Sequence, residues 1–272
     1  MESYSHRLPI ALLGVPFGER HNPYLVLVSS KPLLGLRVLV DEADGAPGAR
    51  ITGPSLGWRF ELALKSFVDV LSSRLEQNLE VELVLDTKLS YPPPSSVYAV
   101  ATISILRAVA EAGGYELSDE EVIEAARSID EEAATWMDYI DALRTAAVRG
   151  KSLAYRHGED AVPLGVGGSV ELELVGEEDL GADVTSLMPS GVLSALVRFS
   201  GMAVIEAINS LRRGSRFSEV FNLASRADNA TYYALYGVHP PQEGCKWTPS
   251  LQRVYAVCLA GEGLGDTVAF VL

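Results

Sequence analysis

Two adjacent serines, Ser95 and Ser96, follow a run of three prolines and stand directly before a long apolar segment. That segment, 97–112, carries charge only at Arg107 and Glu111, so it predicts a largely buried helix. A serine at its start can cap the helix, because the side-chain oxygen accepts a free first-turn N–H. Such a helix start favours an anion such as phosphate. The alternative is a proline-stiffened loop that only begins a core helix.

A second stretch whose residues could take part in binding or catalysis lies near the end of the chain. Gly261, Gly263 and Gly265 separate two apolar runs, 253–259 and 267–272, that read as a pair of strands. Glycines at these places let the backbone take positive φ or approach another group closely. The alternative is an ordinary hairpin bend.

The elements that must position these residues are a mixture of helices and strands. Before the prolines, residues 79–89 alternate apolar and acidic side chains, as a half-buried strand does. Apolar residues at three- and four-residue steps predict a helix over 58–77, and Ser118 with Glu121 forms a capping box that opens a helix to about 134. The pattern also predicts strands over 8–15, 24–29, 36–40, about 49–52 and 169–175, and helices over about 136–149, 192–212 and 218–236. In the strand 169–175, Glu171 and Glu173 alternate with the apolar residues. The fold class is therefore α+β.

Composition restricts the classes of function. The 272 residues are 48% hydrophobic and 21% charged, with a formal net charge of −14, which excludes a general nucleic-acid surface. The four scattered histidines have no metal-ligand spacing, which makes a zinc site improbable. The N-terminus lacks a secretory pattern, and the run 97–106 is too short to span a bilayer, so we expect a cytoplasmic protein without a membrane partner. For Cys245 and Cys258 we expect two buried free thiols rather than a bridge.

Three segments, in their order along the chain, resemble the motifs of the GHMP kinases, the galactokinase, homoserine, mevalonate and phosphomevalonate kinase superfamily. Residues 17–27, with Gly18-Glu19-Arg20-His21, look like the N-terminal Gly-Glu-His motif, although Leu13 replaces its frequent Lys or Arg. Ser95 and Ser96 match the serines of the glycine-serine phosphate loop. Residues 259–266 resemble the C-terminal glycine-rich bend.

The second segment departs from the family pattern. Pro92, Pro93 and Pro94 stand where the phosphate loop has glycines. Proline has no N–H and a fixed φ, so only the N–H groups from Ser95 onward remain to bind an anion.

The resemblance implies roles for particular residues. Ser95, Ser96, Gly261, Gly263 and Gly265 would bind the phosphates of ATP. Ser96 and Asp130 would hold Mg²⁺, with Glu131 or Glu132 as substitutes, although residues 130–132 also read as a solvated helix end. Asp141, eleven positions after Asp130, would be the catalytic base, with Asp138 as its rival.

For the whole chain the resemblance implies a ribosomal-protein-S5-like N-terminal half, 1–158, and a ferredoxin-like C-terminal half, 159–272. The implied activity is transfer of the γ-phosphoryl group of ATP to a hydroxyl of a small metabolite, of mevalonate or shikimate type, with Mg²⁺ as cofactor. A homodimer is compatible with this reading. The triple proline favours an alternative, a GHMP-fold protein that has lost catalysis and serves as a binding or assembly module.

Overall fold

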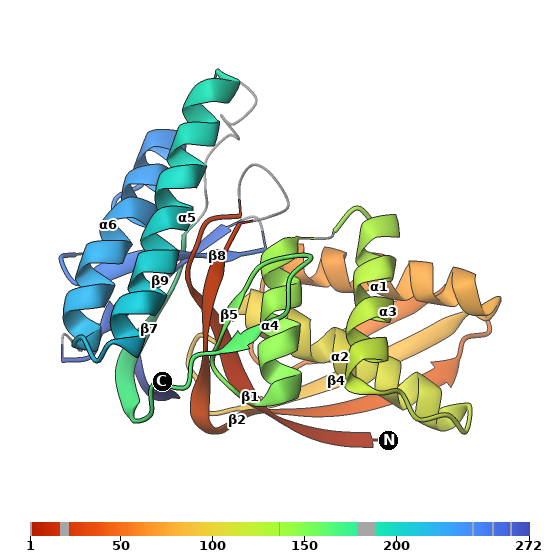
Figure 1. The fold of residues 1–272 in the computed structure, drawn as a ribbon. Helices are drawn as coiled ribbons and strands as arrows, with labels where there is room; N and C mark the ends of the chain where they lie inside the picture. Colours follow the sequence, from red (N-terminus) through yellow and green to blue (C-terminus); the bar gives the residue numbers. More distant parts are fainter. Residues whose placement is uncertain are drawn as a thin grey trace.

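The computed structural model describes residues 2–16, 22–135, 137–178, 189–240, 242–251, 253–261 and 263–272. Its strands are β1 Glu2–Leu13, β2 Tyr24–Glu42, β3 Gly48–Thr52, β4 Leu79–Thr87, β5 Leu153–Tyr155, β6 Val162–Pro163, β7 Ser169–Glu178, β8 Cys245–Ser250, β9 Arg253–Leu259 and β10 Asp266–Val271. Its helices are α1 Trp58–Leu75, α2 Pro94–Ala112, α3 Asp119–Glu132, α4 Asp138–Arg149, α5 Ser190–Arg212 and α6 Phe217–Tyr236. The α+β class predicted from the sequence is confirmed (Figure 1).

One curled sheet runs through the molecule, in the order β3-β4-β2-β10-β7-β9-β8, with β1 and β5 also pairing with β2. The two strands predicted over 24–29 and 36–40 are one 19-residue strand, β2, which continues through Pro32. In its first third, β2 pairs with β10 through Val28 and Ser29, and this pairing joins the first and last parts of the sheet.

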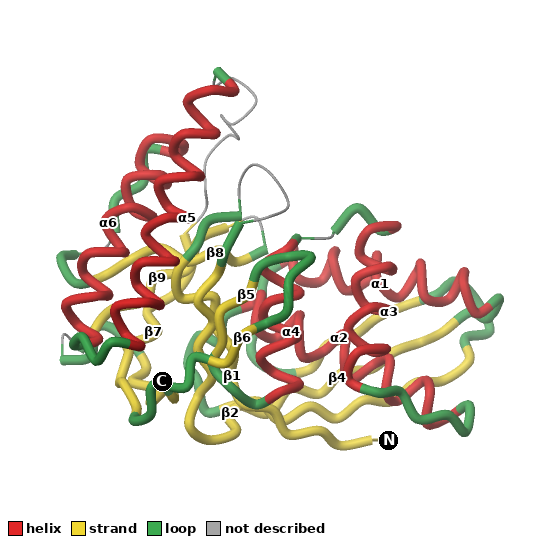
Figure 2. The backbone as a smooth tube through the Cα atoms, viewed as in Figure 1, coloured by secondary structure: helices red, strands yellow, loops and turns green. Residues whose placement is uncertain are grey.

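Helices α1 to α4 group beside β1, β2 and β4, whereas α5 and α6 form a separate pair beside β7, β8 and β9 (Figures 1 and 2). The alternation predicted for β4 is confirmed, since Val81, Leu83 and Leu85 are buried while Glu80 and Glu82 are exposed. Burial of the apolar face of such a strand stabilises the sheet on one side and leaves the other to solvent.

Helix α2 is the core element of the first half, as its sequence predicts. It packs against α1, α3, α4, β1 and β2, so residues from Pro94 to Leu106 are all buried. The predicted serine cap is wrong: Pro93 is the N-cap, and Ser95 and Ser96 lie inside the first turn. The capping box of α3, by contrast, is confirmed at Ser118 and Glu121.

The second half has its own small apolar cluster, in which Val197 and Tyr232 of the helix pair pack on Trp247, Val254 and Ala256 of the sheet. Strand β8 carries part of this cluster and has no counterpart among the predicted strands. The proposed boundary at 158/159 falls in the turn between β5 and β6, which pair with each other. The two-domain division stays a prediction.

Cys245 and Cys258 form a disulfide between the paired strands β8 and β9, so the expectation of two free thiols is wrong. The two residues face each other directly in the register of the hairpin, a relation that their separation of 13 residues does not reveal.

Two helices in the described part of the chain, α2 and α5, are long and apolar enough to cross a membrane by length and composition. The most apolar window of α2 is 72% buried, as in a core helix of a soluble protein, whereas that of α5 is only 33% buried. Cytoplasmic localisation stays a prediction.

Candidate functional site

The N-terminus of α2, the predicted phosphate site, is closed by the protein itself. The Ser96 hydroxyl donates to the backbone carbonyl of Pro9 on β1. The Ser95 hydroxyl lies 3.4 Å from the carbonyl of Pro249 on β8. Both serines are almost fully buried, at 3% and 1% exposure for Ser95 and Ser96. Their hydroxyls therefore stabilise the packing of α2 on two strands and do not face an open site.

The turn between β8 and β9 covers this helix mouth. Leu251 adopts a left-handed backbone conformation, with φ of 38°, and its N–H donates to the Tyr139 hydroxyl of α4 at 2.8 Å. The Tyr255 hydroxyl donates to the carbonyl of Tyr91, in the loop before α2. The β8–β9 hairpin is thus hydrogen-bonded through Leu251 to α4 and through Tyr255 to the loop before α2.

The backbone N–H groups of the glycine-rich bend have an internal acceptor. The N–H groups at Gly261, Gly263 and Leu264 donate to the carboxylate of Glu173, at 2.8 to 3.0 Å. Asp266, at the end of the bend, accepts a hydrogen bond from the N–H of Ser90, four residues before α2 begins. The bend therefore lies beside the loop that leads to α2, but an internal carboxylate occupies its cluster of N–H groups.

Lack of space for a side chain explains why one of the three positions, 265, is a glycine. At Gly265 a Cβ atom would lie 2.1 Å from the carbonyl oxygen of Leu174, so only glycine allows β10 to approach β7 at this point. Glu173 itself is only 2% exposed, although alternation predicted a solvent-facing side chain. Glu173 is buried beneath the glycine-rich bend, whose N–H groups at Gly261, Gly263 and Leu264 donate to its carboxylate.

Asp130 and Asp141, the predicted metal ligand and base, meet in a buried ionic cluster. Arg144 contacts Asp130 at 2.6 Å and Asp141 at 3.2 Å, and all three side chains have 0% exposure. Arg127 adds a second ion pair to Asp141, at 2.6 Å. Burial alone would lower the pKa of Arg144, but the charges of Asp130 and Asp141 outweigh burial and raise it.

Two hydroxyls complete the hydrogen bonds of Asp130. Tyr98 donates to its Oδ1 at 2.6 Å and Thr135 lies 3.1 Å from the same oxygen. In the part of the chain that the structure describes, no group of three or more His, Cys, Asp or Glu side chains could hold a metal ion. The donor set does not fit Mg²⁺, because Asp130 is neutralised by an arginine and Ser96 is bonded to a backbone carbonyl.

Asp138, the rival base, has a different environment. It is the first residue of α4, is 7% exposed, and accepts a hydrogen bond from the Tyr24 hydroxyl at 2.8 Å. Burial raises the pKa of Asp138 from 3.8 to about 6, although the bond from Tyr24 opposes the shift. A carboxyl group with such a pKa can take or give a proton near neutrality.

A pocket of about 260 Å³ lies between α1 and the segment just before α4. Its lining residues are Trp58, Arg59, Leu62, Ala63, Ser66, Ala133, Ala134, Thr135, Met137 and Leu251. The Arg59 guanidinium lies 5.3 Å from the centre of the Trp58 ring. An adjoining space shares Arg59 and Leu251 with the pocket and reaches Pro94, but it has no room for a water molecule. The pocket is therefore separated from the mouth of α2.

A buried ion pair in the second half was not predicted. Lys246 on β8 contacts Asp228 on α6 at 2.6 Å, and its ammonium also donates to the carbonyl of Leu12. Asp228 further accepts bonds from the N–H of Gly14 and the hydroxyl of Ser200. Burial lowers the pKa of Lys246, and the charge of Asp228 opposes this. The pair joins α5, α6, β8 and the end of β1, so its role is structural.

Of the first motif, residues 17–27, the structure describes only residues 22–27. Residues 17–21, which include Gly18 and Glu19, lie outside the described part of the chain. Of its flanks, Asn22 donates to the carbonyl of Val15, and Tyr24 begins β2 with its side chain fully buried.

Neither a protein-family model nor a curated protein sequence matches this chain. Solved structures do match this chain. A mevalonate kinase from L. major in complex with R-mevalonate is 16% identical, with a TM-score of 0.60, over 97% of this chain and 88% of that one. The mevalonate kinase of Methanococcus jannaschii is 11% identical, with a TM-score of 0.60, over 100% and 98% of the two chains. A Streptococcus pneumoniae phosphomevalonate kinase in complex with phosphomevalonate and AMPPNP is 10% identical, with a TM-score of 0.59, over 100% and 92%. The chain is therefore built on the fold of the GHMP kinases.

Proposed function

We propose that this chain is a small-molecule-binding protein on the GHMP kinase fold that does not transfer the γ-phosphoryl group of ATP. The observation that carries the proposal is the packing at the mouth of α2, where Ser95 and Ser96 donate to backbone carbonyls and Leu251, just after β8, donates to Tyr139 of α4. Phosphoryl transfer relies on a cradle of free donors and a cation at the phosphates. Here the hydroxyls of Ser95 and Ser96 already donate to backbone carbonyls of β8 and β1.

The internal carboxylates support the same conclusion. Glu173 saturates the N–H groups of the glycine-rich bend, and Arg144 neutralises Asp130 and Asp141 together. The contacts of Glu173 are charge-assisted bonds at a partly buried position, and the ion pairs of Arg144 lie in the interior, where they are costly to break. A nucleotide would have to displace several of them to bind in the manner that the sequence motifs imply.

The pocket beside Trp58 is the place that we propose for the ligand. Its walls are mostly apolar, with Arg59, Ser66 and Thr135 as the polar groups. This combination suits a small ring-bearing metabolite that carries hydroxyl or carboxylate groups, since Trp58 offers a face for stacking and Arg59 a charge-assisted donor. One structure with this fold, the L. major mevalonate kinase, is a complex with the small molecule R-mevalonate.

Fluorescence titration tests the ligand proposal. Shikimate and adenosine, as ring-bearing hydroxylated probes, would be titrated against the wild type and against Ala133→Trp, which fills the pocket. We expect at least one probe to give a saturable change in fluorescence with the wild type and with the control Ala234→Leu, whose substitution is at an exposed position. Ala133→Trp should lose this change. If neither probe binds the wild type, or if Ala133→Trp binds as well as the wild type, the pocket assignment is wrong.

A small-molecule kinase is the second candidate function, and the environment of Asp138 favours it. The carboxyl group is adjacent in sequence to Met137, which lines the pocket, and its raised pKa suits the acceptance of a proton from a substrate hydroxyl. An assay of ADP release with mevalonate, shikimate, homoserine and pantoate separates the two candidates. Turnover that Asp138→Asn reduces by about 10²–10⁴-fold would establish the kinase, whereas we expect no turnover above background.

A further inference from the structure

The hydroxyl group of Tyr24 lies within hydrogen-bonding distance of two acceptors. Its oxygen is 2.8 Å from Oδ1 of Asp138, at the start of α4, and 3.1 Å from the backbone carbonyl oxygen of Val15, just after β1. A phenol has a single hydrogen to donate, although its oxygen can also accept one. Both contacts are therefore hydrogen bonds at the same time only when Asp138 is protonated and donates to Tyr24, which leaves the hydrogen of Tyr24 for Val15.

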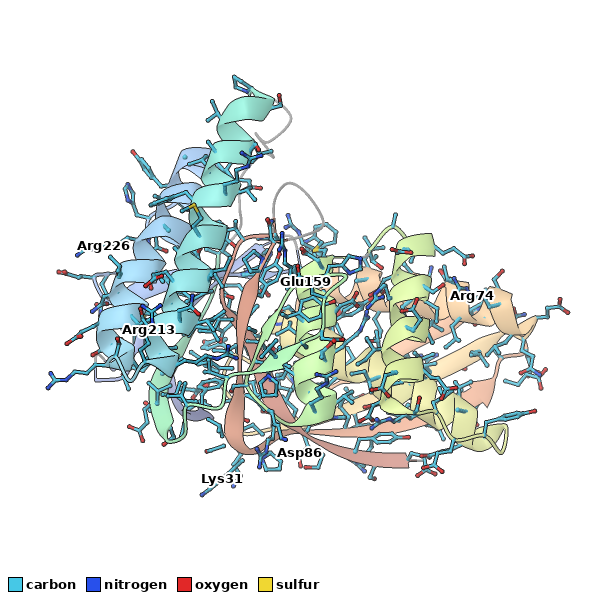
Figure 3. The ribbon with its side chains drawn as sticks, viewed as in Figure 1. Lys31, Arg74, Asp86, Glu159, Arg213 and Arg226 are labelled. Carbon is cyan, nitrogen blue, oxygen red and sulfur yellow. A yellow bond between two sulfur atoms is a disulfide. The ribbon has the colours of Figure 1, made fainter. Side chains whose placement is uncertain are left out.

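The three groups are shielded from water. Val15, Tyr24 and Asp138 are 1%, 0% and 7% exposed. Side chains such as those of Arg74 and Asp86 lie at the surface of the molecule instead, where water completes their hydrogen bonds (Figure 3). When Asp138 is ionised, the hydrogen of Tyr24 turns to the carboxylate, and the oxygens of Tyr24 and Val15 face each other across 3.1 Å without a hydrogen between them. In a dry interior such a contact is unfavourable.

The backbone leaves space for the Tyr24 ring beside the end of β1. At Gly14, whose φ is +113°, a Cβ atom would lie 2.6 Å from Cδ1 of this ring and 2.7 Å from the carbonyl oxygen of Pro23. A side chain at position 14 would therefore push the ring away from Val15 and Asp138. Tyr24 thus connects the start of β2 with α4 and with the chain that leaves β1.

We propose that Asp138, Tyr24 and Val15 form a proton-dependent latch that fastens the start of α4 to the backbone just after β1. With Asp138 protonated, the hydrogen bonds run without a break from Asp138 through Tyr24 to Val15. With Asp138 ionised, its proton has gone to solvent, Tyr24 donates to the carboxylate, and the contact between Tyr24 and Val15 opens. The carbonyl of Val15 then keeps the bond from Asn22. The latch is independent of the ligand proposed for the pocket beside Trp58.

The groups around Asp138 set the pH range of the change. Burial and the charge of Asp141 raise the pKa of Asp138 to about 6, against the opposing effect of the hydrogen bond from Tyr24. Arg127 and Arg144, which pair with Asp141, stay cationic, because the charge of Asp141 outweighs burial and raises the pKa of each. Burial also raises the pKa values of the surrounding tyrosines, which stay neutral: Tyr24 of β2, Tyr139 of α4, Tyr155 of β5 and Tyr232 of α6. Among these groups, Asp138 is therefore the one whose charge changes near pH 6.

Carbonyl NMR of the full-length chain tests the latch. Labelling with carbonyl-¹³C valine and ¹⁵N proline gives one carbon–nitrogen signal for each Val-Pro pair, and the sequence has two such pairs, Val15-Pro16 and Val162-Pro163. Pro163→Ala removes the second signal and so assigns the first to Val15. In the wild type the Val15 signal should shift with pH, with a midpoint near 6.

Three variants decide whether the shift comes from the latch. Asp138→Asn, whose amide donates to Tyr24 at every pH, should hold the Val15 signal at its low-pH position. Tyr24→Phe should abolish the shift. His21→Gln is the control, because an unperturbed histidine titrates near pH 6.5 and position 21 is beside Asn22 in the chain. This control should leave the midpoint unchanged.

Each contrary outcome is specific. A Val15 signal that stays unchanged between about pH 5 and pH 8 overturns the latch. A shift that persists in Tyr24→Phe or in Asp138→Asn also overturns it, as does a shift that His21→Gln removes. Circular dichroism shows whether each variant is folded. Asp138→Asn, which retains a hydrogen bond with Tyr24, decides the matter even if Tyr24→Phe does not fold.

Discussion

Asp138 and Asp141 lie one helical turn apart on α4, yet their carboxyl groups are in opposite electrostatic environments. Asp141 is held between Arg127 and Arg144, so its charge is compensated on both oxygens. Asp138 accepts a hydrogen bond from the Tyr24 hydroxyl, and burial raises its pKa to about 6. Of the two, Asp138 is therefore the group that can exchange a proton near neutrality. Asp141 as the base stays a prediction without support from this geometry.

Replacing Asp138 by asparagine should stabilise the protein at pH 7. The folded state holds the proton of Asp138 more tightly than the unfolded chain, so this carboxyl group costs stability as pH rises from 3.8 to about 6. Two pKa units correspond to about 3 kcal/mol, which is the upper bound on the gain. Urea unfolding at pH 4, 5.5 and 7 measures it.

The gain of Asp138→Asn should be small at pH 4 and should reach its full value above pH 6. Asp86→Asn, at an exposed position on β4, is the control and should change little. A variant that gains nothing between pH 4 and pH 7 would contradict the environment that we assign to Asp138.

Arg144→Met should destabilise the protein by about 3–5 kcal/mol at pH 7, because it leaves Asp130 and Asp141 buried with less compensating charge. Arg156→Met, which breaks the exposed pair with Glu159, is the matched control and should cost less than about 1 kcal/mol. Equal effects of the two substitutions in urea unfolding would show that the buried cluster is not structural.

At the scale of single residues, the sequence indicated which acids matter but not what they do. Asp130, Asp138 and Asp141 were all candidates, and all three are buried. The roles of Asp130 and Asp141 depend on two arginines that contact them in the folded state, Arg144 of α4 and Arg127 of α3. Spacing along the chain does not encode which carboxylate an arginine will reach.

At the scale of elements, the packing of the β8–β9 turn determines how the N-terminus of α2 is enclosed. The turn lies beside the mouth of α2, where Pro249 accepts a hydrogen bond from Ser95 and Leu251 donates to Tyr139. Helices and most strands were predictable because their apolar periodicity is strong, as in α1, β4 and α6. Strand β8 was not, because Lys246 and Pro249 interrupt its apolar pattern and its burial depends on the ion pair with Asp228.

Glycine substitution in the proline loop tests this element directly. Pro92→Gly/Pro94→Gly restores backbone freedom and one N–H in the first turn of α2, but the β8–β9 turn still covers it. We therefore expect binding of Mg·ATP to remain weaker than about 1 mM in calorimetry, equivalent to less than about 4 kcal/mol. Sub-millimolar binding by this variant would show that the prolines alone, and not the turn, exclude the nucleotide.

At the scale of the whole molecule, one sheet carries both groups of helices, and β2 with β10 joins them. The chain covers nearly the full length of kinases in the GHMP fold, so the architecture is complete even where the motifs have changed. The fold tolerates this because its stability comes from the apolar core around α2 and not from the phosphate loop. Retention of the fold therefore does not require retention of phosphoryl transfer.

Calorimetric titration of the wild-type chain with Mg·ATP, to several millimolar, tests the central claim most directly. The closed mouth of α2, the Glu173-filled bend and the arginine-neutralised acids predict no saturable heat of binding. Saturable one-to-one binding with a dissociation constant below about 1 mM, together with ADP release on addition of a hydroxylated metabolite, would contradict the account and establish the kinase.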